Sequence, residues 1–431
     1  MVKSSTVVGA LLLGMSVASS AWAEANLVGF DQERIPGQFI VRMKDGSIAS
    51  RSFFRQAGVT PLHGYSSTPA YLVQADHGQE MDALAVLRND PEVAFIQANR
   101  IFRISKVPND PNYSSQYHHK NVGSAAAWDI STGDKSVIVG VIDTGVDYNH
   151  PDIAPNIWVN PGETGLDAQG RDKRSNKVDD DGNGYVDDFH GWDFVNKDND
   201  PMDDMGHGTH TSGIIGAAGN NATGVAGINW NVSLVGLKVF GASGEGDLDT
   251  IVQAVEYANN NGFTITNNSW GGETDKLPTD ADEDVLRDAI AAGAAKGYLF
   301  VAAAGNSSAN NDKKPQIPAS YPLANIISVA STGGNDSLSF FSNYGPTTVH
   351  IAAPGSNVLS TLPNKKTGAM SGTSMAAPVV TGAAALLKAV HPEFDAAALK
   401  ERLLETADPI ASLKGRLITG ARVNVGKALA D

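Results

Sequence analysis

The sequence predicts an α/β fold in which a parallel sheet is flanked by helices on both faces and is preceded by a small α+β module. Nearly all-apolar stretches of strand length alternate with helical stretches from residue 136 onward. Strands that are apolar on both sides belong to parallel sheets buried between two helical layers. Before residue 105 the elements are shorter, and a Pro- and Asn-rich linker at 106–112 separates the two parts.

The first 23 residues have the form of a signal peptide. Lys3 precedes an apolar run at 7–17, and Ala21-Trp22-Ala23 supplies the small residues of a cleavage site. The apolar run is too short, and too interrupted by Gly and Ser, to span a membrane. We therefore expect a secreted protein, extracellular or periplasmic in transit, with no membrane attachment once residues 1–23 are removed.

The α+β module is predicted to cover residues 24–105. Apolar periodicity places its expected strands at 38–43, 71–74 and 93–104 and its helices at 48–57 and 80–87. One further strand is expected that the pattern does not locate.

The larger domain is predicted to cover residues 106–431. Its expected strands lie at 136–142, 234–240, 264–266, 298–303, 325–330 and 350–352, and its expected helices at 249–259, 284–295, 379–390 and 396–406. In open parallel sheets the active site lies at the carboxyl ends of the strands. Residues just after these strands are therefore the candidates for chemistry.

Composition excludes some classes of function. Acidic residues outnumber basic ones by 47 to 32, which gives a formal net charge of −15. Nucleic acid is not expected as a partner, because phosphate-binding surfaces need an excess of Lys and Arg. The chain has no cysteine, so an exported form has no disulfides, and bound metal ions are one usual substitute. No pattern indicates an oligomer, and we expect a monomer.

Ser374 stands among small residues just ahead of the helical run at 379–390. At a helix N-terminus, backbone N–H groups and the helix dipole favour negative charge that develops near a serine hydroxyl. This is a suitable position for the nucleophile of an acyl-transfer reaction. A plain N-cap serine is the alternative.

Two further residues suit a catalytic site. Asp143 follows the strand at 136–142, where it can orient a histidine, although Asp-Thr-Gly is equally typical of a turn. His207 begins an apolar helical run. With His210 it forms an i, i+3 pair that suggests zinc, but no other ligand lies at a familiar spacing.

The order Asp143, His207, Ser374 is that of the subtilisin triad. Five motifs accompany it in residues 111–431: Val141-Ile142-Asp143-Thr144-Gly145, Gly206-His207-Gly208-Thr209-His210, Asn268-Ser269-Trp270-Gly271, Ala303-Ala304-Gly305-Asn306 and Gly372-Thr373-Ser374-Met375-Ala376-Ala377-Pro378. With them the chain resembles the subtilisin-like serine proteases, in particular the secreted, calcium-binding, thermitase-like members. Residues 34–105 resemble the inhibitory propeptide of that family.

The resemblance implies a secreted serine endopeptidase, made as an autoprocessed zymogen, that hydrolyses protein and peptide substrates and is inhibited intramolecularly by its own propeptide. It makes Ser374 the nucleophile, His207 the general base and acid, and Asp143 the residue that orients the imidazole. It makes the Asn306 amide and the Ser374 backbone N–H the donors to the oxyanion.

The resemblance also implies a substrate cleft. Ser269, Trp270 and Gly271 would pair with an extended substrate backbone, while Ala303, Ala304 and Gly305 would line the other wall of the pocket next to the cut. These small residues predict a roomy pocket that takes apolar or aromatic side chains.

Acidic loops predict two or three structural calcium ions. Residues 179–188 place oxygen ligands at alternate positions with a glycine at the sixth, as an EF-hand loop does, but His190 stands at the twelfth position. The expected ligands of this loop are Asp179, Asp181, Asn183, Tyr185, Asp187 and Asp188. A second loop offers Asp193, Asn196, Asp198 and Asp200. The resemblance implies a third site from Asp110, Asp152, Asn221 and the carbonyls of Gly219, Thr223 and Val225.

Two other functions remain open at this point. One is an inactive family member that serves as a calcium-dependent binding protein. The other is a zinc hydrolase built on His207 and His210.

Overall fold

The computed structural model describes residues 25–31, 34–102, 106–277 and 284–430. The signal peptide predicted at 1–23 lies outside the described residues. The chain forms two compact units, Met1–Ile104 and Ser105–Asp431, and each is described by itself below.

The first unit contains a five-stranded sheet in the order β1-β5-β2-β4-β3. Its elements are β1 (Asn26–Val28), β2 (Arg34–Met43), α1 (Arg51–Gln56), β3 (Val59–Gly64), β4 (Ala70–Ala75), α2 (Glu80–Arg88) and β5 (Val93–Arg100). Phe39, Val73 and Ile96 are fully buried in its core. The α+β class is therefore confirmed. The strand that the pattern did not locate is β3, which contains Pro61 and is exposed beyond Val59, as an edge strand can be. The pattern missed β1 altogether.

The larger unit is built on a nine-stranded sheet in the order β17-β18-β14-β13-β11-β9-β6-β8-β7. Its strands are β6 (Gly133–Asp143), β7 (Gly191–Asp193), β8 (Asn231–Lys238), β9 (Ile265–Asn268), β11 (Leu299–Ala303), β13 (Ile326–Thr332), β14 (Ile351–Pro354), β17 (Asp408–Pro409) and β18 (Ala421–Arg422). All neighbours pair in parallel except β17 and β18. The predicted parallel sheet is confirmed.

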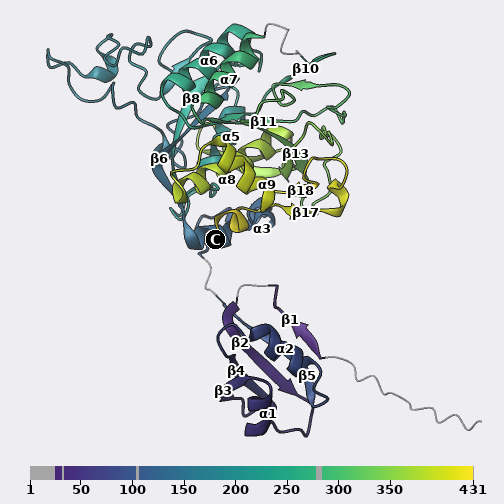
Figure 1. The fold of residues 1–431 in the computed structure, drawn as a ribbon. Helices are drawn as coiled ribbons and strands as arrows, with labels where there is room; N and C mark the ends of the chain where they lie inside the picture. Colours follow the sequence, from purple (N-terminus) through teal and green to yellow (C-terminus); the bar gives the residue numbers. More distant parts are fainter. Residues whose placement is uncertain (1–24, 32–33, 103–105, 278–283, 431) are drawn as a thin grey trace, which may run out of the picture. The chain divides into compact units, whose positions relative to one another are not determined.

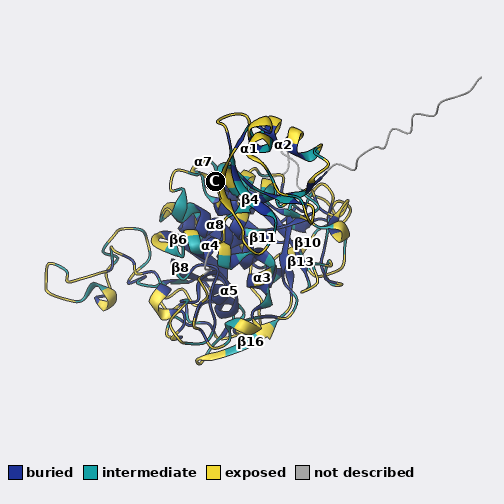
Figure 2. Ribbon diagram, turned by 90° about the horizontal axis from the view of Figure 1, so that it is seen from below, coloured by how far each residue is buried: buried dark blue, intermediate teal, exposed yellow. Residues whose placement is uncertain are grey.

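Helices cover both faces of this sheet, as Figure 1 shows. On one face lie α5 (His207–Gly216) and α8 (Thr373–Val390), with α9 (Ala396–Glu405) outside them. On the other lie α6 (Leu248–Asn260) and α7 (Val285–Ala295). Side chains of β6 alternate between the two: Val139 and Val141 pack with α8, while Ile142 packs with α6. Figure 2 shows the strands and α8 in the dark blue of buried residues.

Helix α8 is buried over most of its length and is rich in Ala and Val. A Cβ at Gly382 would lie only 2.7 Å from the Cβ of Ile228, so this part of the helix tolerates no larger residue. Among the described residues, α8 is also the one helix whose length and composition match a membrane span, but 78% of that stretch is buried inside the unit. It is the central helix of the core.

The sheet reverses its order at β6, whose neighbours are β8 on one side and β9 on the other. Such a reversal opens a crevice at the carboxyl ends of the strands, where ligands bind in α/β folds. Asp143 ends β6, and Ser269 follows β9 directly. The fold therefore brings two of the predicted site residues to the same edge of the sheet.

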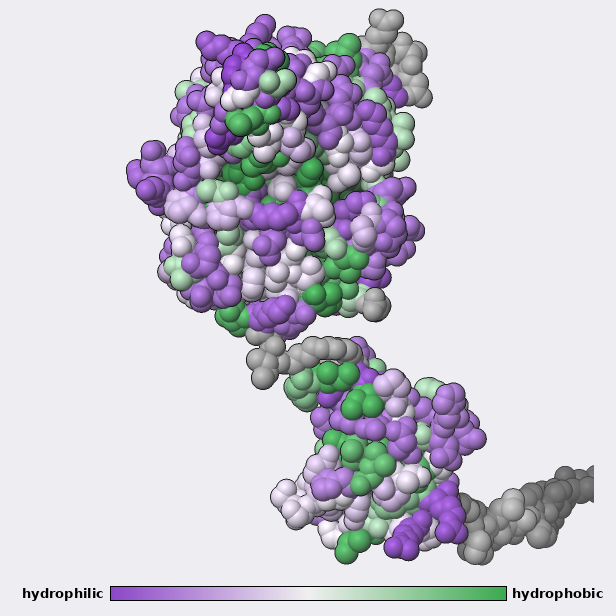
Figure 3. All heavy atoms as spheres, turned by 90° about the vertical axis from the view of Figure 1, so that its left-hand side faces the viewer, coloured by the Kyte–Doolittle hydropathy of each residue, from purple (hydrophilic) through white to green (hydrophobic). Residues whose placement is uncertain are grey.

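Several irregular segments surround this frame. Residues 144–190 form a long excursion between β6 and β7, and part of it projects from the unit in Figure 1. Two small two-stranded sheets are antiparallel: β10 (Gly272–Glu273) with β12 (Gln316–Ile317), and the hairpin of β15 (Val358–Leu362) with β16 (Lys366–Met370). Helices α3 (Tyr117–Val122), α4 (Ser124–Ile130) and α10 (Val425–Leu429) complete the unit. Seen from the side of the excursion, its surface is mostly hydrophilic around smaller apolar patches (Figure 3).

Candidate active site

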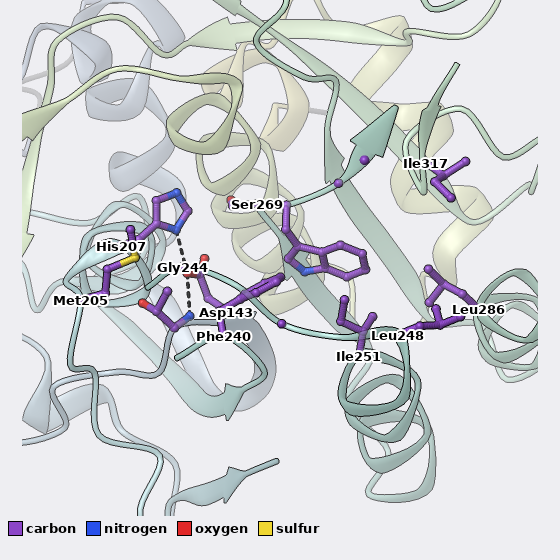
Figure 4. A pocket seen from close by; sticks show the side chains of 15 residues that line it. Asp143, Met205, His207, Phe240, Gly244, Leu248, Ile251, Ser269, Leu286 and Ile317 are labelled. Carbon is purple, nitrogen blue, oxygen red and sulfur yellow. Dashed lines mark hydrogen bonds and ion pairs between the residues drawn. The ribbon is translucent and has the colours of Figure 1, made fainter. Parts of the chain in front are cut away.

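Asp143 and His207 form a hydrogen-bonded pair. Asp143 is the last residue of β6 and is 1% exposed, and His207 is the first residue of α5. The Nδ1 of His207 lies 2.7 Å from an Asp143 oxygen, as Figure 4 shows. Because a carboxylate only accepts hydrogen bonds, Nδ1 carries the proton. The Nε2 atom then has a free lone pair, and it has no hydrogen-bond partner among the described residues, so it is available as a base.

The charge of Asp143 tunes this histidine. Burial lowers the pKa of His207, but the Asp143 carboxylate and its hydrogen bond raise it, and its net pKa lies above the ordinary value of 6.5. A base whose pKa is near or above neutral accepts a proton readily.

The start of α5 is fixed by a residue that the sequence analysis missed, Asp203. This residue is 5% exposed and accepts hydrogen bonds from the Thr144 hydroxyl at 2.8 Å, from the Gly206 N–H at 2.8 Å and from the Thr209 hydroxyl at 2.6 Å. Gly206, the N-cap residue of α5, has no side chain to cap the helix. Asp203 therefore replaces the cap and ties the segment after Asp143 to the segment that holds His207. The signal in the sequence was an acid four residues before the histidine.

Ser374 is the second residue of α8, and the N-cap position belongs to Gly372. The interpretation of Ser374 as an N-cap is therefore wrong. Its hydroxyl donates to the Ser269 carbonyl at 3.1 Å, and the Ser269 hydroxyl donates to the Ser374 carbonyl at 2.9 Å. Among the described residues no hydrogen bond joins Ser374 to His207, so the hydroxyl must leave the Ser269 carbonyl to reach the imidazole. Catalytic hydrogen bonds are often unformed before substrate binds.

Asn306 has a side chain that is held in one orientation. Its Oδ1 accepts from the backbone N–H of Thr373 at 2.9 Å and from the Thr373 hydroxyl at 3.0 Å. Only an oxygen can accept from a backbone N–H, which leaves the Nδ2 group facing the other way. Nδ2 makes no hydrogen bond among the described residues. A free donor beside the first turn of α8 is suited to stabilise an oxyanion.

Two cavities meet at Ser269. The first has a volume of about 500 Å³ and lies beside His207; Phe240, Leu248, Ile251 and Leu286 make it mainly apolar (Figure 4). The second, of about 400 Å³, is lined by Asn306, Thr373 and Ser374. Ser269, Trp270 and Gly271 line both cavities. The histidine and the serine thus open into adjoining parts of one cleft.

The predicted wall of small residues is partly different from the expectation. Ala303 and Gly305 line the second cavity. Ala304 does not, and it is fully buried beneath the site with Ala330 and Ala352. Successive side chains of an extended segment point to opposite sides, so Ala304 cannot share the direction of its two neighbours.

Three carboxylates gather in the excursion at 144–190. Glu163, Asp179 and Asp181, which we call the Glu163 cluster, each place an oxygen within 4.8 Å of the others. Glu163 is fully buried, and its Oε2 has no hydrogen-bond partner. Burial, with the neighbouring carboxylates, raises the pKa of Glu163 to about 7. Of the other two, Asp179 is half-buried and Asp181 is exposed. Oxygen ligands that repel one another are suited to hold a metal ion.

The rest of the predicted EF-hand-like loop lies around this cluster. Asp179 accepts from the N–H groups of Gly182 at 2.7 Å and Gly184 at 2.8 Å, which closes the turn. Glu163, 16 residues before Asp179, supplies the third carboxylate, which the sequence analysis missed because it searched only within the loop.

Asn183 donates from its amide to Asp181 of the cluster at 3.3 Å, whereas the predicted ligands Asp187 and Asp188 lie outside the cluster. Asp187 accepts from the Lys177 N–H at 3.1 Å. Asp188 is buried and accepts from the amides of Asn183 at 2.9 Å and Asn160 at 2.6 Å. The ring of Tyr185 packs against aromatic side chains.

The second predicted loop is a tight turn around Asp193. The buried Asp193 carboxylate accepts from the N–H and the amide of Asn196 at 2.9 and 2.8 Å, and its own N–H donates to the Asp198 carbonyl. Asp200 accepts instead from the Tyr148 hydroxyl at 2.8 Å. The loop brings Asp193, Asn196 and Asp198 together, while Asp200 faces Tyr148.

The third predicted set gathers around Asp152. Asp152 is fully buried and accepts from the Asn221 amide at 2.9 Å and from the Val225 N–H at 2.8 Å. Asp110 accepts from the N–H of Asn220 at 2.6 Å. Burial raises the pKa of Asp152 to about 6, and the Asp110 charge adds to this effect. Gly219 and Thr223 belong to the same loop as Asn221.

The zinc alternative finds no support in this geometry. The Nδ1 of His207 is taken by Asp143, and the Nε2 of His210 lies 3.1 Å from the Gly368 carbonyl. Burial lowers the pKa of His210 to about 4. Within the described ranges, the cluster that could hold a metal contains neither histidine.

Comparison with known proteins agrees with the site. A model of the subtilase family matches residues 134–425. A thermophilic serine proteinase of a Bacillus species (strain AK1) is 32% identical over 393 residues, which are 90% of this chain and 86% of that protein. Thermitase of Thermoactinomyces vulgaris is 35% identical over 323 residues, 75% of this chain and 99% of that protein.

A solved structure is similar as well. A chain described as a protease from Pseudoalteromonas arctica superposes with a TM-score of 0.60 at 27% identity, and covers 75% of this chain and 99% of its own length. The family model matches more than half of the chain, two serine proteases are similar over most of it, and a solved protease has the same fold. The chain therefore belongs to the subtilase family and is a subtilisin-like serine endopeptidase.

Proposed function

We propose that this protein is an exported zymogen whose mature part cuts peptide bonds through Asp143, His207 and Ser374. The observation that carries the proposal is the Asp143–His207 pair at 2.7 Å, with Nε2 free, in the same cleft as Ser374 and Asn306. The inactive binding-protein alternative leaves this arrangement without a purpose.

The reaction follows from these positions. The Ser374 oxygen forms a bond to the carbonyl carbon of the substrate while its proton passes to Nε2 of His207. The C–N bond then breaks, and the same proton passes to the leaving amine. Water repeats the two steps on the acyl-enzyme and releases the acid. Asp143 keeps the imidazole in the tautomer that can accept, and stabilises it when it is charged.

The oxyanion is stabilised by two donors. The first is the backbone N–H of Ser374 at the start of α8, where the helix dipole also favours negative charge. The second is the free Nδ2 of Asn306, whose other end is anchored on Thr373. A donor fixed before the reaction costs no reorganisation when charge develops.

Residues 24–105 are proposed as the propeptide, which assists folding and inhibits the mature domain. In support, the described part of the first unit has its own sheet and its own apolar core. The family membership supports the same role. The cut that separates the two parts is proposed near Ser105.

Calcium is proposed as the structural ion, with two or three sites. The buried Oε2 of Glu163 supports a cation in the Glu163 cluster, and the buried Asp110 and Asp152 support one at the loop 219–225. The turn of Asp193 supports another. The export and calcium proposals fit together, because extracellular calcium is abundant enough to fill sites of modest affinity.

The first prediction concerns maturation. Wild-type protein secreted in the presence of calcium is expected to lose about the first hundred residues, while Ser374→Ala keeps its propeptide because it lacks the nucleophile. Intact mass measures both, and labelling by a fluorophosphonate is expected only for the wild type. Ser371→Ala, which changes an exposed serine three residues away, is the control and is expected to mature normally.

Other outcomes of this experiment are equally informative. If wild type and Ser374→Ala are trimmed identically, another protease performs the maturation. The labelling experiment is then the evidence for the catalytic role of Ser374. If the wild type is neither trimmed nor labelled, the zymogen proposal is wrong and the binding-protein alternative replaces it.

The second prediction concerns pH. The base must be neutral to act, so kcat/KM is expected to rise as pH increases through the pKa of His207, with its midpoint above 6.5. Asp143→Asn removes the charge that raises this pKa. The midpoint is expected to move to lower pH, while turnover falls by roughly 10⁴-fold.

The measurement is the pH profile of kcat/KM on one peptide. Asp288→Asn makes the same charge change at an exposed position of α7 and is expected to leave the profile unchanged. A midpoint that does not move in Asp143→Asn contradicts the assigned pair.

The third prediction concerns the oxyanion. Asn306→Leu is expected to lower kcat by about 10²- to 10³-fold with little change in KM, because the donor acts only on the transition state. Asn306→Asp keeps an acceptor for Thr373 but replaces the N–H by a charged oxygen, and it is expected to lose at least as much. An Asn306→Asp enzyme with nearly normal kcat would show that only the anchor to Thr373 matters.

The fourth prediction concerns calcium. Glu163→Gln is expected to weaken calcium binding in titration calorimetry and to shorten the half-life of activity at elevated temperature when calcium is limiting. Saturating calcium is expected to restore the half-life, because stabilisation depends on the ratio of free ion to Kd. The control is Glu401→Gln, which makes the same change in charge at an exposed position of α9. If the two variants have equal half-lives at low calcium, the proposal that the Glu163 cluster binds calcium is wrong.

A further inference from the structure

The floor of the cavity beside Ser374 is formed by Gln316. This residue lies on β12, which pairs with β10 so that Gln316 stands opposite Glu273. Gln316 lines the second cavity together with Ser307 and Asn306. No feature of the sequence around residue 316 placed it near the catalytic motifs.

The side chain of Gln316 extends between the two walls of this cavity. A Cβ added to Gly271 would lie 2.8 Å from its Nε2, and one added to Gly305 would lie 3.2 Å from its Cδ. A Cβ at Gly271 would also lie 2.7 Å from the Ile317 carbonyl oxygen. One at Gly305 would lie 2.5 Å from the Asn343 amide nitrogen. Gln316 is therefore one of several groups that leave no room for a side chain on these walls.

The amide of Gln316 reaches the cavity, although the residue as a whole is largely buried. The residue is only 7% exposed, and its backbone is paired with Ser320 through the N–H to the hydroxyl at 3.2 Å. Neither side-chain atom makes a hydrogen bond among the described residues. Its oxygen and nitrogen remain accessible to solvent in the cavity, so a substrate side chain that covers them must supply a hydrogen bond in place of water.

The charge at this cavity is negative. Among the described residues that line it, the charged one is Glu273. A hydrogen bond from Ser307 and the nearby Lys314 lower the pKa of Glu273, which is therefore ionised at neutral pH. Lys314 lies outside the lining, 3.4 Å from Glu273, and is largely exposed, so it screens the carboxylate only in part.

We propose that Gln316 and Glu273 make this cavity selective for a long side chain that ends in a hydrogen-bond donor, Lys, Arg or Gln, immediately before the cut. The inference rests on the proposed function, because only the catalytic role of Ser374 makes this cavity the pocket beside the cut. The stem of the side chain lies along Ala303 and the glycines, and its end donates to the Gln316 oxygen. Glu273 adds attraction for the two cationic side chains and repels acidic ones.

This proposal reverses the expectation drawn from small residues, which was a pocket for apolar or aromatic side chains. A flat ring would cover the Gln316 amide without satisfying it. A site whose hydrogen-bonding groups become buried when the ligand binds discriminates strongly against ligands that leave them unpaired.

The test is a series of peptides that differ only in the residue before the cut: lysine, glutamine, norleucine, phenylalanine and glutamate. The mature wild-type enzyme is expected to give at least tenfold higher kcat/KM for lysine and glutamine than for norleucine, which has the same length without a donor. Active enzyme is counted by fluorophosphonate labelling, so that differences in folding do not enter the ratios.

Two variants separate the roles. Gln316→Leu keeps the volume but removes the acceptor, and it is expected to lower both the lysine-to-norleucine and the glutamine-to-norleucine ratios by about ten- to a hundredfold. Glu273→Gln is expected to lower the lysine-to-glutamine and lysine-to-norleucine ratios and to leave the glutamine-to-norleucine ratio unchanged. Gln169→Leu, on an exposed turn far along the chain, is the control and is expected to change none of these ratios.

Contrary results have distinct meanings. A labelled wild-type enzyme that prefers norleucine or phenylalanine overturns the pocket proposal and leaves the proposed function intact, even if Gln316→Leu fails to fold. Unchanged ratios in labelled Gln316→Leu overturn it as well. A wild-type protein that neither labels nor cleaves any of the five peptides overturns the proposed function, and this inference with it.

Discussion

The burial of α8 against the centre of the sheet is the constraint on which the rest of the larger unit depends. Its Ala, Val and Gly residues pack on β6, β11 and β13 and approach Ile228 closely at Gly382. Close packing of this kind leaves a helix few ways to shift along its axis. The position of Ser374, in the first turn of α8, is thus set by apolar contacts that extend several turns away from it.

The other side of the cleft is positioned by polar contacts. Asp203 joins Thr144 to the start of α5, and Ser269 joins the end of β9 to Ser374 through two reciprocal hydrogen bonds. These bonds lie at the edge where the sheet reverses its order, so residues from four separated segments meet there. The apolar core fixes the frame, and a few buried polar side chains fix the orientation of the reacting groups within it.

The sequence was sufficient for the sheet, because the apolar runs at 136–142 and 298–303 can be buried on both sides only in a parallel sheet. The motifs also named Asp143, His207, Ser374 and Asn306 as candidates through the family resemblance, and the fold brings these four residues to adjoining cavities. The sequence was insufficient for Glu163, Asp203 and Gln316. Each of these acts through contacts made across the fold, and neither local periodicity nor spacing reports such contacts. The prediction that Ala304 lines the pocket was wrong for a simpler reason, because a sequence motif does not indicate to which side of a strand a residue points.

The two cavities that meet at Ser269 form one cleft, in which the proposed function places the substrate as a single extended strand. A folded target offers helices, sheets and tight turns at its surface, and none of these enters such a cleft intact. A segment must first separate from its own structure, so the susceptibility of a protein is governed by the free energy of opening that segment. Frayed termini and loose loops are cut first, and the order of cuts in a mixed population follows the local stability of the targets more closely than their sequences.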